Sequence, residues 1–193
     1  MIGKSLFIGD LTEWTALDPE KDAATLSTWT ANLQFSSELF QKPGRPYAVH
    51  EVKKKVKEQL KEADEKKNEF VFAVRKKGTR EMVGLLKFGW LQFSQQSARL
   101  FLDFESDEAI SLYGEEVLSM VLRYGFMEIS LHRIWLMLSG HQQKEISLFE
   151  AAGFLRENQR REESFYEGRF YDSLGYSLLK PEWKKKQQTE VAA

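Results

Sequence analysis

The sequence contains no cysteine and carries almost no net charge. Among its 193 residues, 28 basic side chains stand against 29 acidic ones, which gives a formal net charge of -1 at pH 7. The absence of cysteine excludes disulfides, thiolate metal sites and a cysteine nucleophile. The balanced charge gives no reason to expect a nucleic-acid partner or a membrane-surface protein, because these need a concentration of positive side chains.

Long apolar runs and paired histidines are also missing. No apolar stretch approaches the roughly 20 residues that a membrane-spanning helix needs. The apolar stretch near the N-terminus, residues 5–8, is too short for a signal peptide. Together with the lack of cysteine, this favours a cytoplasmic location. The three histidines (His50, His132 and His141) do not pair at ligand spacing, so no metal site is predicted.

What remains is the composition of a protein with a substantial core. Hydrophobic residues make up 42% of the chain and aromatic residues 13%, and the length fits one domain. Neither an internal repeat nor a linker-like stretch divides the sequence. We therefore expect one domain over residues 1–183, followed by a polar and frayed tail over residues 184–193.

The first third of the chain is predicted to be mostly helical. Asp18 can cap a helix that has Pro19 at its first position and ends near Gln34. Its inward-facing side chains would be Ala23, Leu26, Trp29, Ala31 and Leu33. Two of the four prolines mark a loop over residues 41–47, and a highly charged helix is expected over residues 48–67.

The remaining two thirds alternate between strand and helix periods. Strands are expected over residues 69–75, 82–92, 98–104 and 133–138, and helices over residues 115–128 and 143–151. A final hairpin of residues 154–166 and 169–179 would turn at Glu167 and Gly168. This order is typical of an α/β (α+β) fold with an antiparallel front half and a crossover in the middle.

Four segments in this order resemble the GNAT N-acetyltransferases. Residues 114–126 and 131–134 are similar to the helix after the family's acetyl-CoA loop and to the strand that follows it. Residues 146–154 resemble the family's next helix. Residues 166–172, with Glu182 and Trp183, resemble the closing hairpin of the RimJ/RimL-like (ribosomal-protein-alanine acetyltransferase) branch. The resemblance implies the GNAT fold, a mixed and mostly antiparallel splayed sheet flanked by helices.

The same resemblance implies that acetyl-CoA is the acyl donor and that its pantetheine arm lies in the gap of the splayed sheet. The arm would bind the main chain of residues 100–104, which makes Leu102 and Phe104 candidate contacts. The pyrophosphate would rest on N–H groups at the start of the next helix, where the helix dipole favours an anion. Ungapped counting puts this loop at residues 109–114. Its candidate cofactor contacts are Ser111, Leu112, Tyr113, Gly114 and Glu115.

This loop departs from the family's glycine-rich pattern. Ile110 and Leu112 stand where the family has glycines, and Ala109 stands where a positive residue is common. Gln142 replaces an asparagine that often contacts the cofactor. Three acidic residues precede the loop and would repel pyrophosphate. Two interpretations stay open: a modified loop that still binds CoA, or a helix N-terminus that is no longer used for phosphate.

Amine acetylation needs a base for the ammonium proton and stabilisation of the thioester oxyanion. In many GNAT enzymes a tyrosine also protonates the departing thiolate, but the aligned residue here is Phe149, a further candidate cofactor contact that has no hydroxyl. Candidate bases are Asp103 and Glu105 at the end of the splayed strand, and Ser139 or His141 after the following strand. Each of these four also has a simpler interpretation as a polar residue of a strand end, turn or surface loop.

The sequence therefore predicts an N-acetyltransferase that transfers acetyl from acetyl-CoA to a primary amine, either a protein N-terminus or a small molecule. The alternative is a non-catalytic GNAT-like binding or regulatory module with a degenerate acetyl-CoA loop. A homodimer formed through the last hairpin or the sheet edges is an arrangement that this branch allows.

Overall fold

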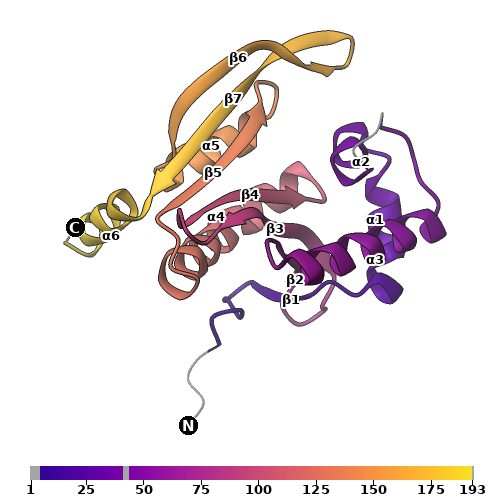
Figure 1. Cartoon of the computed structure of the whole chain (residues 1–193), viewed down its shortest axis with the longest axis horizontal. Helices are drawn as coiled ribbons and strands as arrows, with labels where there is room; N and C mark the ends of the chain where they lie inside the picture. Colours follow the sequence, from indigo (N-terminus) through magenta and orange to yellow (C-terminus); the bar gives the residue numbers. More distant parts are fainter. Residues whose placement is uncertain (1–4, 41–43, 193) are drawn as a thin grey trace.

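The computed structural model describes residues 5–40 and 44–192, which fold around a seven-stranded sheet (Figure 1). Its spatial order is β1-β2-β3-β4-β5-β7-β6. The strands are β1 (Thr12–Ala16), β2 (Phe70–Lys76), β3 (Met82–Gln92), β4 (Ser97–Phe104), β5 (Arg133–Ser139), β6 (Leu155–Tyr166) and β7 (Arg169–Leu179). All neighbours pair antiparallel except β4 and β5, which are parallel. The predicted mixed and mostly antiparallel sheet is confirmed.

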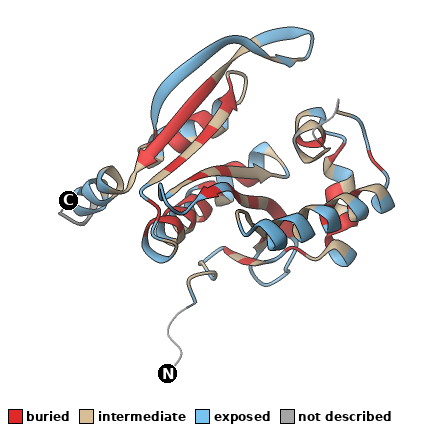
Figure 2. Ribbon diagram, in the orientation of Figure 1, coloured by how far each residue is buried: buried red, intermediate tan, exposed pale blue. Residues whose placement is uncertain are grey.

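Helices cover both faces of this sheet. They are α1 (Pro19–Trp29), α2 (Leu33–Phe40), α3 (Val49–Lys66), α4 (Asp107–Arg123), a π-helical turn η1 (Tyr124–Glu128), α5 (Gln143–Ala152) and α6 (Lys180–Ala192). On one face, Leu26 of α1 and Val52 of α3 pack against Ala73 of β2. On the other face, α4 and α5 form a larger core with the same strands, because successive strand residues alternate between faces. Figure 2 shows the buried residues along the strands and α4.

The first helical region is two helices rather than one. Asp18 caps α1 as predicted, accepting a hydrogen bond from the Glu20 N–H at 2.9 Å. The helix ends at Trp29, because Asn32 then caps a separate helix by accepting hydrogen bonds from the N–H groups of Gln34 and Phe35. The predicted continuation to Gln34 is therefore wrong, and Leu33 is 56% exposed instead of inward-facing. Residues 41–43 of the predicted loop lie outside the described residues.

The closing hairpin forms as predicted. Glu167 and Gly168 both adopt positive φ values, 46° and 78°, which is the backbone of a tight two-residue turn. Residues 184–192, expected as a frayed tail, instead continue α6. Within the described residues, we find no helix with the length and apolar character that crossing a membrane requires.

Candidate active site

The sheet opens between its two parallel strands. β4 and β5 pair only where Ser97, Ala98 and Arg99 meet residues 133–135. Farther along, residues 100–104 stay paired with β3 and residues 136–139 stay paired with β7, so the two strands diverge (Figure 1). Unpaired strand edges offer main-chain hydrogen-bonding groups to an extended ligand. A pantetheine arm, which is extended and carries two amides, fits such a gap.

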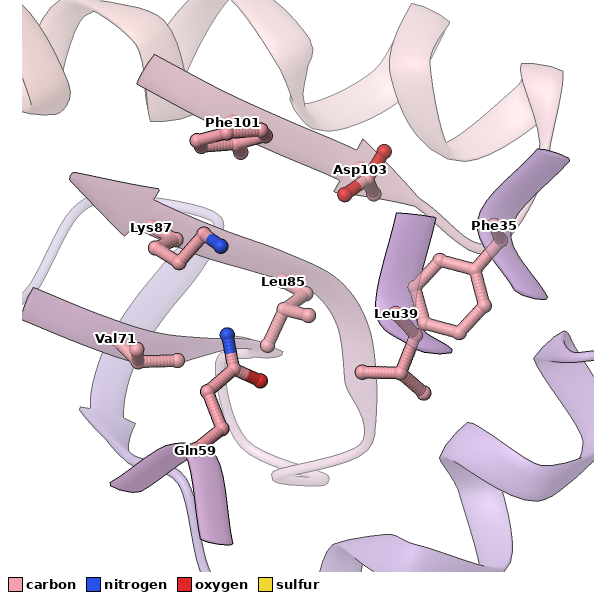
Figure 3. A pocket seen from close by; sticks show the side chains of 8 residues that line it. All are labelled: Phe35, Leu39, Gln59, Val71, Leu85, Lys87, Phe101 and Asp103. Atoms are coloured by element: carbon pink, nitrogen blue, oxygen red, sulfur yellow. The ribbon is translucent and has the colours of Figure 1, made fainter. Parts of the chain in front are cut away.

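The candidate cofactor contacts and the candidate base on β4 lie on opposite faces of the sheet. Leu102 and Phe104 pack against the core beneath α4, so only their main chain is available to a ligand in the gap. Asp103 lies on the opposite face, where it lines a small pocket of ≈ 40 Å³ with Phe35 and Leu39 of α2 (Figure 3). This alternation follows from the two-residue period of a strand.

A larger cavity lies at the end of β5. Its volume is ≈ 880 Å³, and its walls come from α2, from the end of β5 and from the tip of the β6–β7 hairpin. Ser139 and His141 line it together. The Ser139 hydroxyl lies 2.8 Å from Nδ1 of His141, and Nε2 of the same ring lies 2.9 Å from Oε1 of Gln34. Because a carbonyl oxygen only accepts, this pairing keeps the ring proton on Nε2 and leaves Nδ1 to accept from Ser139.

Aromatic rings fix the orientation of His141. The ring of Tyr166 stacks on the imidazole at 4.1 Å with an interplanar angle of 1°, and Tyr171 packs at 5.2 Å. Burial lowers the pKa of His141 below its ordinary value, and the nearby carboxylate of Glu167 opposes this shift. The imidazole is therefore neutral at physiological pH, which is the form that can accept a proton.

The structure does not bring the predicted carboxylate bases into this cavity. Asp103 lines the small pocket described above. Glu105 is exposed, and its N–H still donates to the carbonyl of Val83 on β3 at 3.1 Å. Partial burial and the neighbouring charge of Glu81 raise the Glu105 pKa. Of the three predicted catalytic residues, only Ser139 lies beside another proton-accepting group in the large cavity.

The predicted phosphate loop is a helix. α4 begins at Asp107, and Ser106 caps it by accepting a hydrogen bond from the Ala109 N–H at 3.2 Å. The expectation of a loop over residues 109–114 is therefore wrong, because a serine cap, an acidic first turn and the lack of internal glycines before Gly114 favour helix from Asp107 onward. The N–H groups of residues 111–115 lie inside this helix, where they bond to carbonyls of the preceding turn.

The side chains of this segment divide between packed and exposed positions. Gly114 faces α5 so closely that an added Cβ would lie 2.9 Å from Cδ2 of Leu148. Ile110 is buried, whereas Leu112 is 64% exposed and Glu115 is also exposed. Tyr113 packs against the core. The glycine predicted to approach phosphate instead allows two helices to approach each other.

Two further predicted contacts lie on α5 or at its start. Oε1 of Gln142 accepts a hydrogen bond from the Ser139 N–H at 2.8 Å, which fixes the main chain at the end of β5. Phe149 is only 2% exposed, and its ring packs against Phe154 at 5.2 Å and 80°. The structure thus places Gln142 beside the cavity and Phe149 in the core, away from the cavity lining.

The importance of His141 was only partly visible in the sequence. Its position after a strand makes it one of four alternative bases, but its partner Gln34 lies 107 residues away in the sequence. No periodicity or short motif links such distant residues. Within the described residues, no cluster of three or more histidine, aspartate or glutamate side chains could hold a metal ion.

The sequence profile of the acetyltransferase (GNAT) domain matches residues 17–174. The chain belongs to the GNAT acetyltransferase family. Its predicted family and fold are thereby confirmed, and acetyl-CoA is the acyl donor of this class of enzyme. The open gap between β4 and β5 lies within the residues that match the family profile.

Three curated relatives match part of this chain. An uncharacterized N-acetyltransferase of Bacillus subtilis, YoaA, is 26% identical over 57% of this chain and 62% of its own length. The spermidine N(1)-acetyltransferase of Vibrio cholerae is 22% identical over 56% of this chain and 63% of its own length. A putative ribosomal N-acetyltransferase of Bacillus subtilis, YdaF, is 33% identical over 33% of this chain and 35% of its own length. The matches thus span less than two thirds of these relatives.

A solved structure shows the same fold over nearly the whole chain. Spermidine N-acetyltransferase from Vibrio cholerae, in complex with CoA and spermine, superposes with a TM-score of 0.74 at 20% identity, and the match covers 91% of this chain and 99% of the other. These relatives include both a polyamine and a ribosomal acetyltransferase, so membership of the predicted RimJ/RimL-like branch stays a prediction.

Proposed function

We propose that this protein transfers an acetyl group from acetyl-CoA to a primary amine bound in the cavity at the end of β5. The observation that carries this proposal is the Ser139–His141 pair, 2.8 Å apart, in a cavity beside the open gap of the sheet. The gap would hold the pantetheine arm along residues 100–104, and the cavity would hold the acceptor. Gln142 supports this arrangement indirectly by fixing the main chain of Ser139.

The chain's residues supply the proton transfer that this reaction needs. An acceptor amine arrives as an ammonium and must lose a proton before its nitrogen can attack the thioester carbonyl. The Ser139 hydroxyl takes this proton while it passes its own to Nδ1 of His141. The resulting imidazolium donates to Ser139 through Nδ1 and to Gln34 through Nε2. As the new C–N bond forms, the C–S bond breaks, the nitrogen loses its second proton to solvent, and the leaving thiolate takes up a proton from solvent. His141 then returns its proton to solvent through Ser139.

The charges of the cavity do not favour an acceptor with several positive charges. Among the described lining residues, the charged side chains are Glu167 and Arg99. A polyamine, which is the acceptor named for the relatives from Vibrio cholerae, carries several positive charges and needs several carboxylates for electrostatic complementarity. A monoamine or a peptide N-terminus matches one carboxylate better. A peptide N-terminus would also agree with the RimJ/RimL-like resemblance.

A thiol-release assay with acetyl-CoA and a panel of amines tests this function. The panel contains a monoamine, short peptides with different N-terminal residues, spermidine and spermine. We expect release above the rate without amine for a monoamine or peptide, and an acetylated product by mass spectrometry. If no amine accelerates thiol release and calorimetry detects no acetyl-CoA binding at millimolar concentration, the chain is instead a non-catalytic GNAT module.

A further inference from the structure

Both helices that begin at the open end of the gap have acidic first turns. β4 and β5 are parallel, so α4 and α5 follow strand ends that lie at the same edge of the sheet. The two helix starts are adjacent, because Lys144 of α5 forms an ion pair with Asp107 of α4 at 3.2 Å. Any group that extends out of the gap past these helix starts meets their side chains first.

The start of α4 has its own groups at the positions where an anion would bind. Ser106 accepts the hydrogen bond from the Ala109 N–H, and Asp107 and Glu108 add two carboxylates to the first turn. Carboxylates at this end of a helix interact favourably with its dipole. The helix start is therefore stabilised from within the chain, and two negative charges surround it.

The start of α5 is similar. Glu145 lies in the first turn of α5 and adds a carboxylate there. Burial raises the Glu145 pKa, and the nearby charge of Asp107 raises it further. The nearby cation, Lys144, is engaged with the carboxylate and the carbonyl of Asp107.

These features oppose the binding of a diphosphate. A diphosphate at a helix start needs unpaired N–H groups and positive charge, because its affinity comes from charge-assisted hydrogen bonds. The residues present fit the pantetheine arm in the gap but do not fit the diphosphate beyond it. Ile110 and Leu112 stand where the family has glycines, and this agrees with the absence of a diphosphate site. Their side chains prevent the close approach of backbone to phosphate that glycine permits.

We propose that this protein recognises its acyl donor through the pantetheine arm, so that acetyl thioesters of pantetheine and 4′-phosphopantetheine serve nearly as well as acetyl-CoA. The inference rests on the proposed function and specifies its donor class. In each case the acceptor nitrogen replaces the thiolate on the acetyl carbonyl, and the free thiol of the arm is released.

A comparison of three acyl donors tests this inference separately from the proposed function. The value of kcat/KM is measured by thiol release with acetyl-CoA, acetyl-4′-phosphopantetheine and acetyl-pantetheine. We expect the three values to lie within about 10-fold, whereas each charge-assisted hydrogen bond to a diphosphate would change binding by about 10- to 100-fold. Acetyl-CoA exceeding acetyl-pantetheine by more than about 10-fold overturns this inference alone. Absence of turnover with every donor instead contradicts the proposed function.

Binding measurements with charge variants provide a second readout. By calorimetry at low salt, the double variant Asp107→Asn with Glu108→Gln should bind CoA about 3- to 10-fold more tightly, because two repelling charges are removed. Its affinity for pantetheine should not change. The control pair Asp64→Asn with Glu65→Gln removes the same charge from an exposed part of α3 and should change neither affinity. An unchanged CoA affinity in the first variant contradicts the electrostatic basis of the inference.

Discussion

The acceptor cavity and the helix starts at the end of the gap differ in the charge they present. The cavity at the end of β5 combines neutral hydroxyl and amide groups with aromatic rings, and burial keeps His141 neutral. The first turns of α4 and α5 instead carry the carboxylates of Asp107, Glu108 and Glu145, and burial together with the charge of Asp107 raises the pKa of Glu145. Under the proposed function, the cavity supplies the groups for proton transfer, whereas the carboxylates at the helix starts oppose the binding of a diphosphate.

Removing the imidazole from the cavity should have the largest effect. We expect His141→Gln to lower kcat by about 10²- to 10⁴-fold, the usual contribution of a general base, because the Ser139 hydroxyl then has no proton acceptor. The matched control is His132→Gln at the opposite end of β5, where the side chain is exposed. Steady-state kinetics at saturating donor and acceptor measure both. Equal rates for the two variants would show that His141 and its cavity take no part in the reaction.

Truncating Phe149, a core residue of α5, should have the next largest effect. Phe149→Ala should lower the free energy of unfolding by about 3–5 kcal/mol, because it leaves a void in a fully packed core. Phe149→Tyr tests the family's tyrosine acid directly. It should cost about 1–3 kcal/mol for a buried hydroxyl without a partner.

Urea denaturation measures both losses of stability, and kcat of Phe149→Tyr is compared with that of the original protein. An increase in kcat would show that this position reaches the reacting groups, which would contradict its placement in the core.

A side chain at Gly114 should have a moderate effect. Gly114→Val places atoms against Leu148, and we expect a loss of about 1–3 kcal/mol in the free energy of unfolding from overpacking between α4 and α5. The affinity for CoA, measured at a temperature where the variant is folded, should not change. If CoA binding falls while stability is preserved, Gly114 contacts the donor after all.

The smallest effect should come from the charge beside the imidazole. The Glu167 carboxylate raises the pKa of His141, in opposition to burial. Glu167→Gln should therefore lower that pKa and move the acidic limb of the kcat profile to lower pH, by less than about half a unit for an interaction near the surface. A shift toward higher pH would contradict the assigned neighbours of His141.

The sequence predicts those elements whose signals are local. The cap at Asp18, the charged helix around Val52 and the turn at Glu167–Gly168 depend on residues within a few positions of one another, and each forms as expected. The GNAT family was also predictable, because four ordered segments resemble it. Such local and ordered patterns carry information that a single chain displays directly.

The site was less predictable because its contacts join distant segments. Gln34 reaches His141 only because α2 is a separate helix, and the break after Trp29 depends on a cap at Asn32 that competes with a continuous apolar pattern. The early start of α4 was not predicted, because residues 109–114 were aligned with a loop of the family. Ser106, which caps the helix, was a local signal for the earlier start. Where local physics and family resemblance disagree, the local capping signal predicts the structure of this segment.

The dependence of kcat on pH tests the central claim most directly. In the proposed mechanism the neutral imidazole is the active form, and burial lowers the pKa of His141 from its ordinary value of 6.5. Activity should therefore be present above this lowered pKa and should fall as the pH drops through it. We expect an acidic limb with a midpoint below 6.5 in the original protein and in His132→Gln, and we expect this limb to be lost in His141→Gln. The same acidic limb in all three proteins would contradict the assignment of His141 as the proton acceptor.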